Sequence, residues 1–117
     1  MTLNLESSER AYRAPNIDNV LRRRVRQLVA PFHERIGPWQ SQLARLRVTR
    51  MFRAREDVRA QAAELSPLVV AARIELEAAV MDANDAAVAR HSLVASVRAA
   101  LERLRCELDE LSCASEQ

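Results

Sequence analysis

Apolar residues recur along the last half of the chain at helical spacing, and this repeat constrains the fold more than any other feature of the sequence. Positions alternately four and three apart are apolar at eleven of thirteen places, in one unbroken phase. Such a repeat predicts a helix with one side packed against other helices. The thirteen positions are Val69, Arg73, Leu76, Val80, Ala83, Ala87, Arg90, Val94, Val97, Leu101, Leu104, Leu108 and Leu111.

Two interpretations of residues 67–111 are open. One is a single helix of about 45 residues, roughly 68 Å long at the usual rise per residue, which would need a second copy or a neighbouring subunit to cover it. The other is a helical hairpin broken near residues 82–85, where Asn84 or Asp85 can cap a new helix. The break contains no glycine or proline, so the sequence does not decide between them.

The remaining composition also favours helix. The 117 residues include 20 alanines but a single glycine, Gly37, and alanine is the strongest helix former while β-proteins need glycine in their turns. We therefore predict an all-α fold, a small helical bundle or helical hairpin with a long C-terminal heptad-patterned helix.

Prolines suggest where the upstream helices begin and end. A first helix is predicted to begin near Asn16 or Asp18 and to stop or kink at Pro31, followed by a short turn or a single helical turn over residues 31–38. A second helix should run from Pro38 to about Leu65, and Ser66-Pro67 should begin the next. The predicted core positions of the second helix are Ala44, Val48, Met51, Val58, Ala62 and Leu65.

These elements divide the chain into three parts. Residues 1–15 are polar and without periodicity, which predicts a flexible N-terminal arm. Residues 16–112 should form a single helical domain, a size that suits one core. Residues 113–117 should be a frayed tail.

Charge is distributed unevenly. Residues 1–60 hold thirteen arginines and six acidic residues, a net charge of +7, whereas residues 61–117 hold five arginines and ten acidic residues, a net charge of −5. This asymmetry has two explanations: a basic surface that binds an anionic partner, or a basic half that packs against the acidic half of its own or a partner chain.

The first explanation predicts a nucleic-acid-binding surface, DNA or RNA, that follows the phosphate backbone without reading sequence. Guanidinium groups neutralise phosphates, and four aromatic residues in the whole chain leave little for base stacking. The predicted binding residues are Arg22, Arg23, Arg24, Arg26, Arg45, Arg47, Arg50 and Arg53.

The second explanation predicts a structural or adaptor protein, with the arginines paired to acidic residues. It would oligomerise through the 69–111 repeat, a homo- or hetero-oligomer whose association starts at the leucine-rich end. The predicted oligomerisation residues are Val94, Val97, Leu101, Leu104, Leu108 and Leu111.

Residues for catalysis, metals or membranes are not grouped into any recognisable pattern. One glycine excludes phosphate-binding glycine loops, and His33 and His91 lie 58 residues apart outside any ligand motif. Cys106 and Cys113 are too far apart on one helix to bridge each other, and we expect packed or half-buried thiols. We expect no enzyme, cofactor or metal, no membrane contact, and a cytoplasmic location.

In size, helix content and arginine load, residues 16–111 resemble the small helical subunits of CRISPR effector complexes. The resemblance rests on this general layout and on no motif. It implies a non-catalytic subunit of a larger assembly whose basic faces line a nucleic-acid strand.

Overall fold

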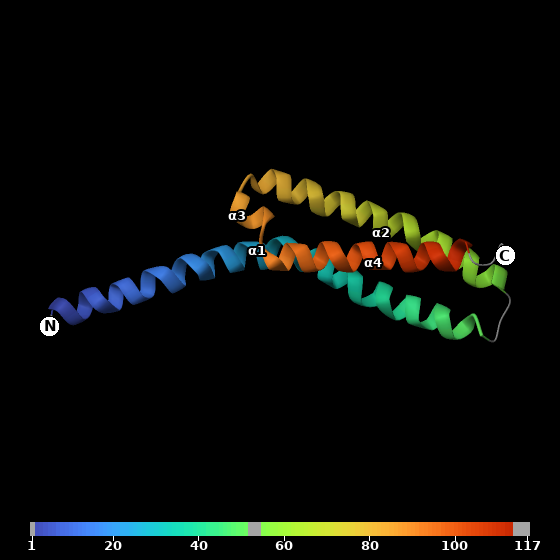
Figure 1. The fold of residues 1–117 in the computed structure, drawn as a ribbon, viewed down its shortest axis with the longest axis horizontal. Helices are drawn as coiled ribbons and strands as arrows, with labels where there is room; N and C mark the ends of the chain where they lie inside the picture. Colours follow the sequence, from blue (N-terminus) through green and yellow to red (C-terminus); the bar gives the residue numbers. More distant parts are fainter. Residues whose placement is uncertain (1, 52–54, 114–117) are drawn as a thin grey trace.

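The fold is all-α, as predicted. A computed structural model describes the backbone of residues 2–51 and 55–113, and the side chains of residues 18–51 and 56–113. Within these ranges it contains four helices and no strand (Figure 1). The helices are α1 (Thr2–Thr49), α2 (Arg55–Ala83), α3 (Ala86–Ala89) and α4 (Ser92–Cys113).

The three long helices form an elongated bundle. Figure 1 shows α2 running antiparallel to both α1 and α4, with the short α3 joining α2 to α4 at one end of the bundle. Each long helix packs against the other two, most extensively α2 against α4. The molecule measures 75 × 27 × 18 Å, and the N-terminal part of α1 extends beyond the other helices.

One core runs the length of the bundle, and α4 supplies its most regular side. All six of the residues predicted for oligomerisation, from Val94 to Leu111, are at most 5% exposed. The chain itself covers them, with heptad-spaced apolar residues from α1 and α2. The buried residues of α1 are Val25, Val29, Phe32, Ile36, Leu43 and Leu46, and those of α2 are Val58, Ala62, Val69, Ala72, Leu76 and Val80.

The hairpin interpretation of residues 67–111 is confirmed, and the single rod is wrong. The helix stops at Ala83 because Asn84 adopts a left-handed conformation, φ 48°, which asparagine tolerates better than most residues. Asp85 then caps α3, accepting a hydrogen bond from the Ala87 backbone N–H at 2.9 Å.

The helix boundaries predicted at Pro38 and Pro67 are wrong, and of the two alternatives at Pro31, a stop or a kink, the stop is wrong. The chain is helical through Pro31 and Pro38, with no turn over residues 31–38, and α2 continues through Pro67. All three prolines are exposed, so the carbonyls that lose a hydrogen-bond partner face water. Figure 1 shows α1 changing direction in its middle, which is how a proline-containing helix accommodates the ring.

Because the second helix does not begin at Pro38, its predicted core face is partly wrong. Val48 and Met51 are 59% and 79% exposed, and Ala44 is also exposed. The core is instead lined by Leu43 and Leu46, which continue the α1 repeat in phase. The core positions predicted within α2 agree with the structure, since Val58 and Ala62 are buried and Leu65 is half-buried.

The N-terminal boundary also differs. α1 begins at Thr2, so residues 2–15 are helical where the sequence predicts a loose arm, and α4 ends at Cys113. The flexibility of the arm, the division at residues 16–112 and the fraying of the tail stay predictions. Residues 114–117 of that tail lie outside the described residues.

Leu104→Asp should unfold the chain rather than separate its copies. Leu104 is 2% exposed inside a single chain, so a carboxylate there has neither water nor a partner. We expect a loss of about 4 kcal/mol or more in the free energy of unfolding, measured by urea denaturation. Ala99→Asp, on the exposed side of the same helix, should cost less than about 1 kcal/mol. A folded, monomeric Leu104→Asp protein would contradict this core.

Asn84→Val should destabilise the α2–α3 connection, because a β-branched residue resists the left-handed conformation at φ 48°. We expect a loss of about 1–2 kcal/mol in thermal or urea unfolding. Asn84→Gly is the control, since glycine adopts this conformation freely and should leave stability nearly unchanged. Equal stability of the valine and glycine variants would show that residue 84 does not hold this backbone conformation.

Candidate nucleic-acid interface

The predicted arginine surface lies mostly on α1, and its members differ in whether an acid neutralises them. Seven of the eight predicted residues are described, and Arg53 lies outside the described residues. All seven side chains belong to exposed residues. Five of them form no ion pair with any described residue: Arg22, Arg23, Arg26, Arg45 and Arg50.

Arginines at the edge of α1 nearest α2 are paired. Arg24 Nη1 lies 3.2 Å from Asp85 Oδ2, and Arg35 Nη2 lies 2.8 Å from Glu75 Oε2. These two arginines are eleven residues apart, three turns of helix, so they project from nearly the same side of α1. Exposed ion pairs add little stability but favour one orientation of α1 over α2.

On the opposite edge, α1 is paired to α4. Arg47 Nη2 lies 2.8 Å from Glu107 Oε1. Together with the Arg24 and Arg35 pairs, this contact joins the basic first half of the chain to the acidic second half. Intrachain pairing therefore accounts for part of the charge asymmetry in the sequence, at the rims where α1 meets its neighbours.

The unpaired arginines occupy two places along α1. Arg22, Arg23 and Arg26 lie within five residues of one another, near the end of the bundle at α3. Arg26 borders a hollow with His33 and Leu93, at the start of α4. Arg45 lies nearer the other end of α1, and Arg50 follows directly after that end. The 19 residues from Arg26 to Arg45 correspond to about 28 Å of helix.

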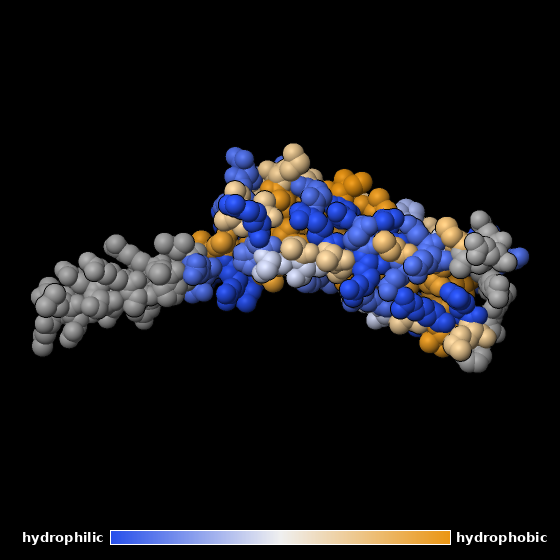
Figure 2. Space-filling model, in the orientation of Figure 1, coloured by the Kyte–Doolittle hydropathy of each residue, from blue (hydrophilic) through white to orange (hydrophobic). Residues whose placement is uncertain are grey.

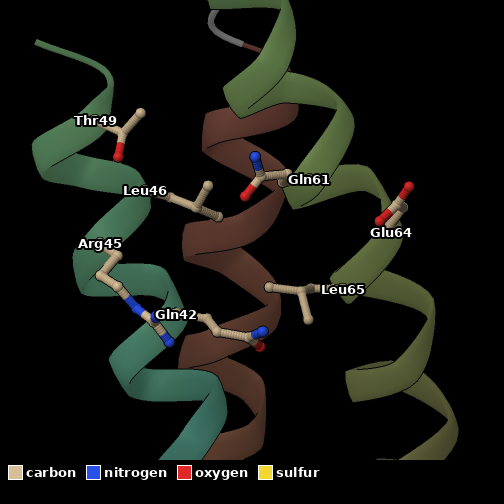
Figure 3. Close-up of a pocket in the computed structure, with 7 residues that line it drawn as sticks. All are labelled: Gln42, Arg45, Leu46, Thr49, Gln61, Glu64 and Leu65. Carbon is tan, nitrogen blue, oxygen red and sulfur yellow. The ribbon is translucent and has the colours of Figure 1, made fainter. Parts of the chain in front are cut away.

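Arg45 borders a shallow hollow between α1 and α2 (Figure 3). Leu46 and Leu65 point from opposite helices into the space between them, and Gln42, Thr49 and Gln61 add polar groups. In Figure 3 the Arg45 side chain extends alongside Gln42, whereas Glu64 lies on the far side of α2. The carboxylate of Glu64 is therefore not the partner of Arg45, and the guanidinium stays open to solvent.

Two arginines of the second half, Arg73 and Arg98, join α2 to α4. Arg98 binds Glu77 through two hydrogen bonds, from Nε at 2.7 Å and from Nη2 at 3.2 Å. Arg73 Nη1 donates to Glu102 Oε2 at 2.6 Å, while its Nε is buried without a partner among the described residues. Arg73 occupies an apolar position of the heptad repeat. The fold accommodates it there because its guanidinium reaches the carboxylate of Glu102 on the neighbouring helix.

Glu102 is the centre of the most connected polar cluster. Arg105 Nη2 donates to Glu102 Oε1 at 2.6 Å, and Arg105 Nη1 donates to Asp109 at 2.8 Å. Ser66 of α2 donates to the other oxygen of Asp109, also at 2.8 Å. The hydrogen bond from Arg105 holds the pKa of Glu102 below its usual value, and Glu102 in turn raises the pKa of Arg105.

The histidines, cysteines and acids of the described ranges form no metal-binding cluster. No three histidine, cysteine or acidic side chains there are placed to share a metal ion. His33 is exposed, and His91 Nδ1 accepts a hydrogen bond from the Leu93 backbone N–H at 3.1 Å, which caps α4. Cys106 and Cys113 are both exposed, so the expectation of packed thiols is wrong.

None of the described helices is long and hydrophobic enough to span a lipid bilayer.

Comparison with family models, curated proteins and solved structures finds no match for this chain. The protein is therefore described by its architecture, an elongated bundle of three long helices with exposed arginines on α1.

The sequence prediction missed one surface feature, a second apolar face on α2. Val70, Ile74 and Met81 are 38%, 65% and 78% exposed, on the side of α2 that faces away from the bundle. Their spacing of four and seven residues is visible in the sequence. The heptad repeat that begins at Val69 predicts one apolar side for this helix, and these three residues lie on another.

Glu102 should make the free energy of unfolding decrease at acidic pH. Its pKa in the folded chain is below the ordinary value of 4.5, so its contribution is present above that pH and is lost as pH falls through the lowered pKa. Urea unfolding across a pH series should show a smaller acid-induced loss of stability for Glu102→Gln than for the unsubstituted protein. Glu110→Gln, which removes an exposed acid without a described ion pair, should keep the original profile. Identical profiles for all three proteins would contradict the role of Glu102.

Proposed function

We propose that the chain is a non-catalytic helical subunit of a larger assembly, and that it binds the backbone of a nucleic acid without reading its sequence. The observation that carries the proposal is the group Arg22, Arg23 and Arg26, which are exposed, adjacent and without an ion pair to any described residue. Unpaired cations held close together on a rigid helix attract a polyanion and cost no internal ion pair when they bind it.

Binding would proceed through phosphate contacts. Each guanidinium offers two parallel N–H donors to a phosphate, and each contact releases condensed counterions. Arg45, about 28 Å from the first group on the same helix, and Arg50, directly after the end of that helix, extend the basic surface. A strand lying along α1 would contact both groups.

The aromatic residues support binding without sequence readout. Phe32 is buried and Trp39 is half-buried against the core, so neither offers a free ring for a base to stack on. Phosphate contacts alone position a nucleic acid but carry no sequence information. The proposed interaction is therefore strongly dependent on salt and indifferent to base composition.

A structural or adaptor role is the second candidate. The pairing of Arg24, Arg35 and Arg47 with acids of the same chain favours it, because those side chains already have partners. Oligomerisation through residues 94–111, however, would require α1 and α2 to leave α4, since the chain itself buries that seam. An adaptor would therefore use a different surface.

Replacing the unpaired arginines should weaken nucleic-acid binding. The triple variant Arg22→Gln, Arg23→Gln, Arg26→Gln removes three phosphate contacts, and the slope of log affinity against log salt should fall by about 3 units for duplex DNA. Fluorescence anisotropy with labelled duplexes and single strands of unrelated sequence, at several salt concentrations, measures both affinity and slope. The unsubstituted chain should bind all sequences similarly and, with five phosphate contacts, lose roughly 500-fold in affinity for duplex DNA between 50 and 200 mM salt.

The matched control removes arginines that are already paired. Arg35→Gln, Arg73→Gln, Arg98→Gln lowers the net charge by the same amount but takes away side chains that bind Glu75, Glu102 and Glu77. After circular dichroism shows that it is folded, this variant should keep most of the affinity and the slope. If both variants lost affinity equally, net charge alone would explain the binding and the position of the arginines would not matter. If the unsubstituted chain did not bind at about 50 mM salt, the proposal would be refuted.

A further inference from the structure

The outer side of α2 carries an uninterrupted apolar stripe that the bundle leaves uncovered. Its residues are three or four positions apart, so they lie along one side of the helix. All of them are exposed, Ile74 by 65% and Met81 by 78%. The outer stripe consists of Ala63, Pro67, Val70, Ile74, Ala78 and Met81.

The outer stripe lies directly opposite the buried side of α2. Each residue advances the helix by about 100°, so Ile74 and Leu76 of the core are about 200° apart, or roughly 160° measured the shorter way around the helix. The 18 residues from Ala63 to Met81 give the stripe a length of about 27 Å, five turns of helix. A helix that is apolar on two opposite sides is usually covered on both, so this face calls for a partner.

A groove beside the stripe adds to its shape. Ala63, Pro67, Val70 and Ile74 line one side of a shallow hollow whose other side is formed by Asp109 and Ser112 of α4. Figure 2 shows hydrophobic residues gathered on the upper edge of the molecule, over α2. The stripe therefore borders a trough between two helices, a shape that accommodates a further helix.

The borders of the outer stripe are acidic. Glu64, Glu75 and Asp82 follow one edge at spacings of eleven and seven residues, which keeps them nearly in line. Glu64 and Asp82 form no ion pair with any described residue. The other border carries Glu77 and, across the groove, Asp109, both of them already bound to arginines.

This charge pattern argues against a second copy of the chain as the occupant. Two α2 helices packed antiparallel about a two-fold axis would place the Glu64–Glu75–Asp82 edge of one against the same edge of the other, where like charges repel. The outward sides of α1 and α4 match less well, because the exposed apolar residues of α1, Val20 and Val48, lie far apart along the helix. Polar side chains such as Gln27, Ser41 and Arg103 occupy the exposed positions of these two helices.

We propose that the outer stripe of α2 is the docking site for a cationic amphipathic helix of a different protein. The partner's apolar side would cover Val70, Ile74 and Met81, and its arginines or lysines would pair with Glu64 and Asp82. The site lies on a different helix from Arg22, Arg23 and Arg26, so it is independent of the proposed nucleic-acid surface. A chain with both surfaces would join a nucleic acid to a protein neighbour.

Two synthetic helical peptides test the proposal on the full chain. Both have the same leucine and alanine seam at three- and four-residue spacing, but one carries arginine at the flanking positions and the other glutamate. In fluorescence anisotropy, the arginine peptide should bind at least tenfold more tightly than the glutamate peptide. Glu64→Gln together with Asp82→Gln should remove most of that preference.

Ile74→Asp is the decisive variant, because it places a charge in the middle of the stripe while the exposed site leaves the fold intact. It should weaken the arginine peptide at least tenfold. Gln27→Asp, which adds the same charge on the exposed side of α1, should have little effect. The triple arginine variant described above should also bind this peptide as the unsubstituted chain does, which separates the docking site from the nucleic-acid proposal.

Three results would overturn the inference. The two peptides could bind equally or not at all, or Ile74→Asp could behave as Gln27→Asp does. Light scattering could also show that the unsubstituted chain is a dimer that Ile74→Asp converts to a monomer, in which case a second copy covers the stripe.

Discussion

Burial of the valine and leucine seam of α4 is the constraint on which the rest of the structure depends. Val94, Leu101 and Leu108 lie in the interior along the whole length of the helix, and α1 and α2 each supply a complementary heptad-spaced side. Burial of these side chains supplies most of the driving force for bringing the helices together. The break at Asn84 serves the same end, since it lets α2 fold back to cover the seam from within the chain.

The arrangement of the three long helices separates the arginines of α1 into a paired group and an unpaired group. Arginines at the rims of α1 meet acids of α2, of the α2–α3 connection and of α4, as Arg35 meets Glu75 and Arg47 meets Glu107. Those farther around the helix, such as Arg23, face solvent. A single charge pattern in the sequence thus has two outcomes, which depend on where each arginine lies, around and along α1, relative to the acids of the neighbouring helices.

The sequence was sufficient for the fold class and for the α4 side of the core, because heptad spacing reports directly which side of a helix is buried. It was misleading at Pro31, Pro38 and Pro67, since a proline on the solvent side of a bent helix leaves its unpaired carbonyl to water. The same α1 repeat that runs from Val25 to Leu46 passes through two of these prolines unchanged. Which arginines of α1 would be paired was beyond prediction, because the pairs join residues 40 to 61 positions apart in the chain, as Arg35 and Glu75 or Arg24 and Asp85 do.

The narrow cross-section of the bundle, 27 × 18 Å, has a consequence for recognition of any kind. Helices are about 10–12 Å wide with their side chains, so a rod of this thickness has room for a single apolar seam shared by its three long helices. Each long helix turns a large part of its circumference outward. The surface proposed for a nucleic acid, on α1, and the surface proposed for a partner helix, on α2, therefore lie on separate flanks of the rod and are accessible at the same time.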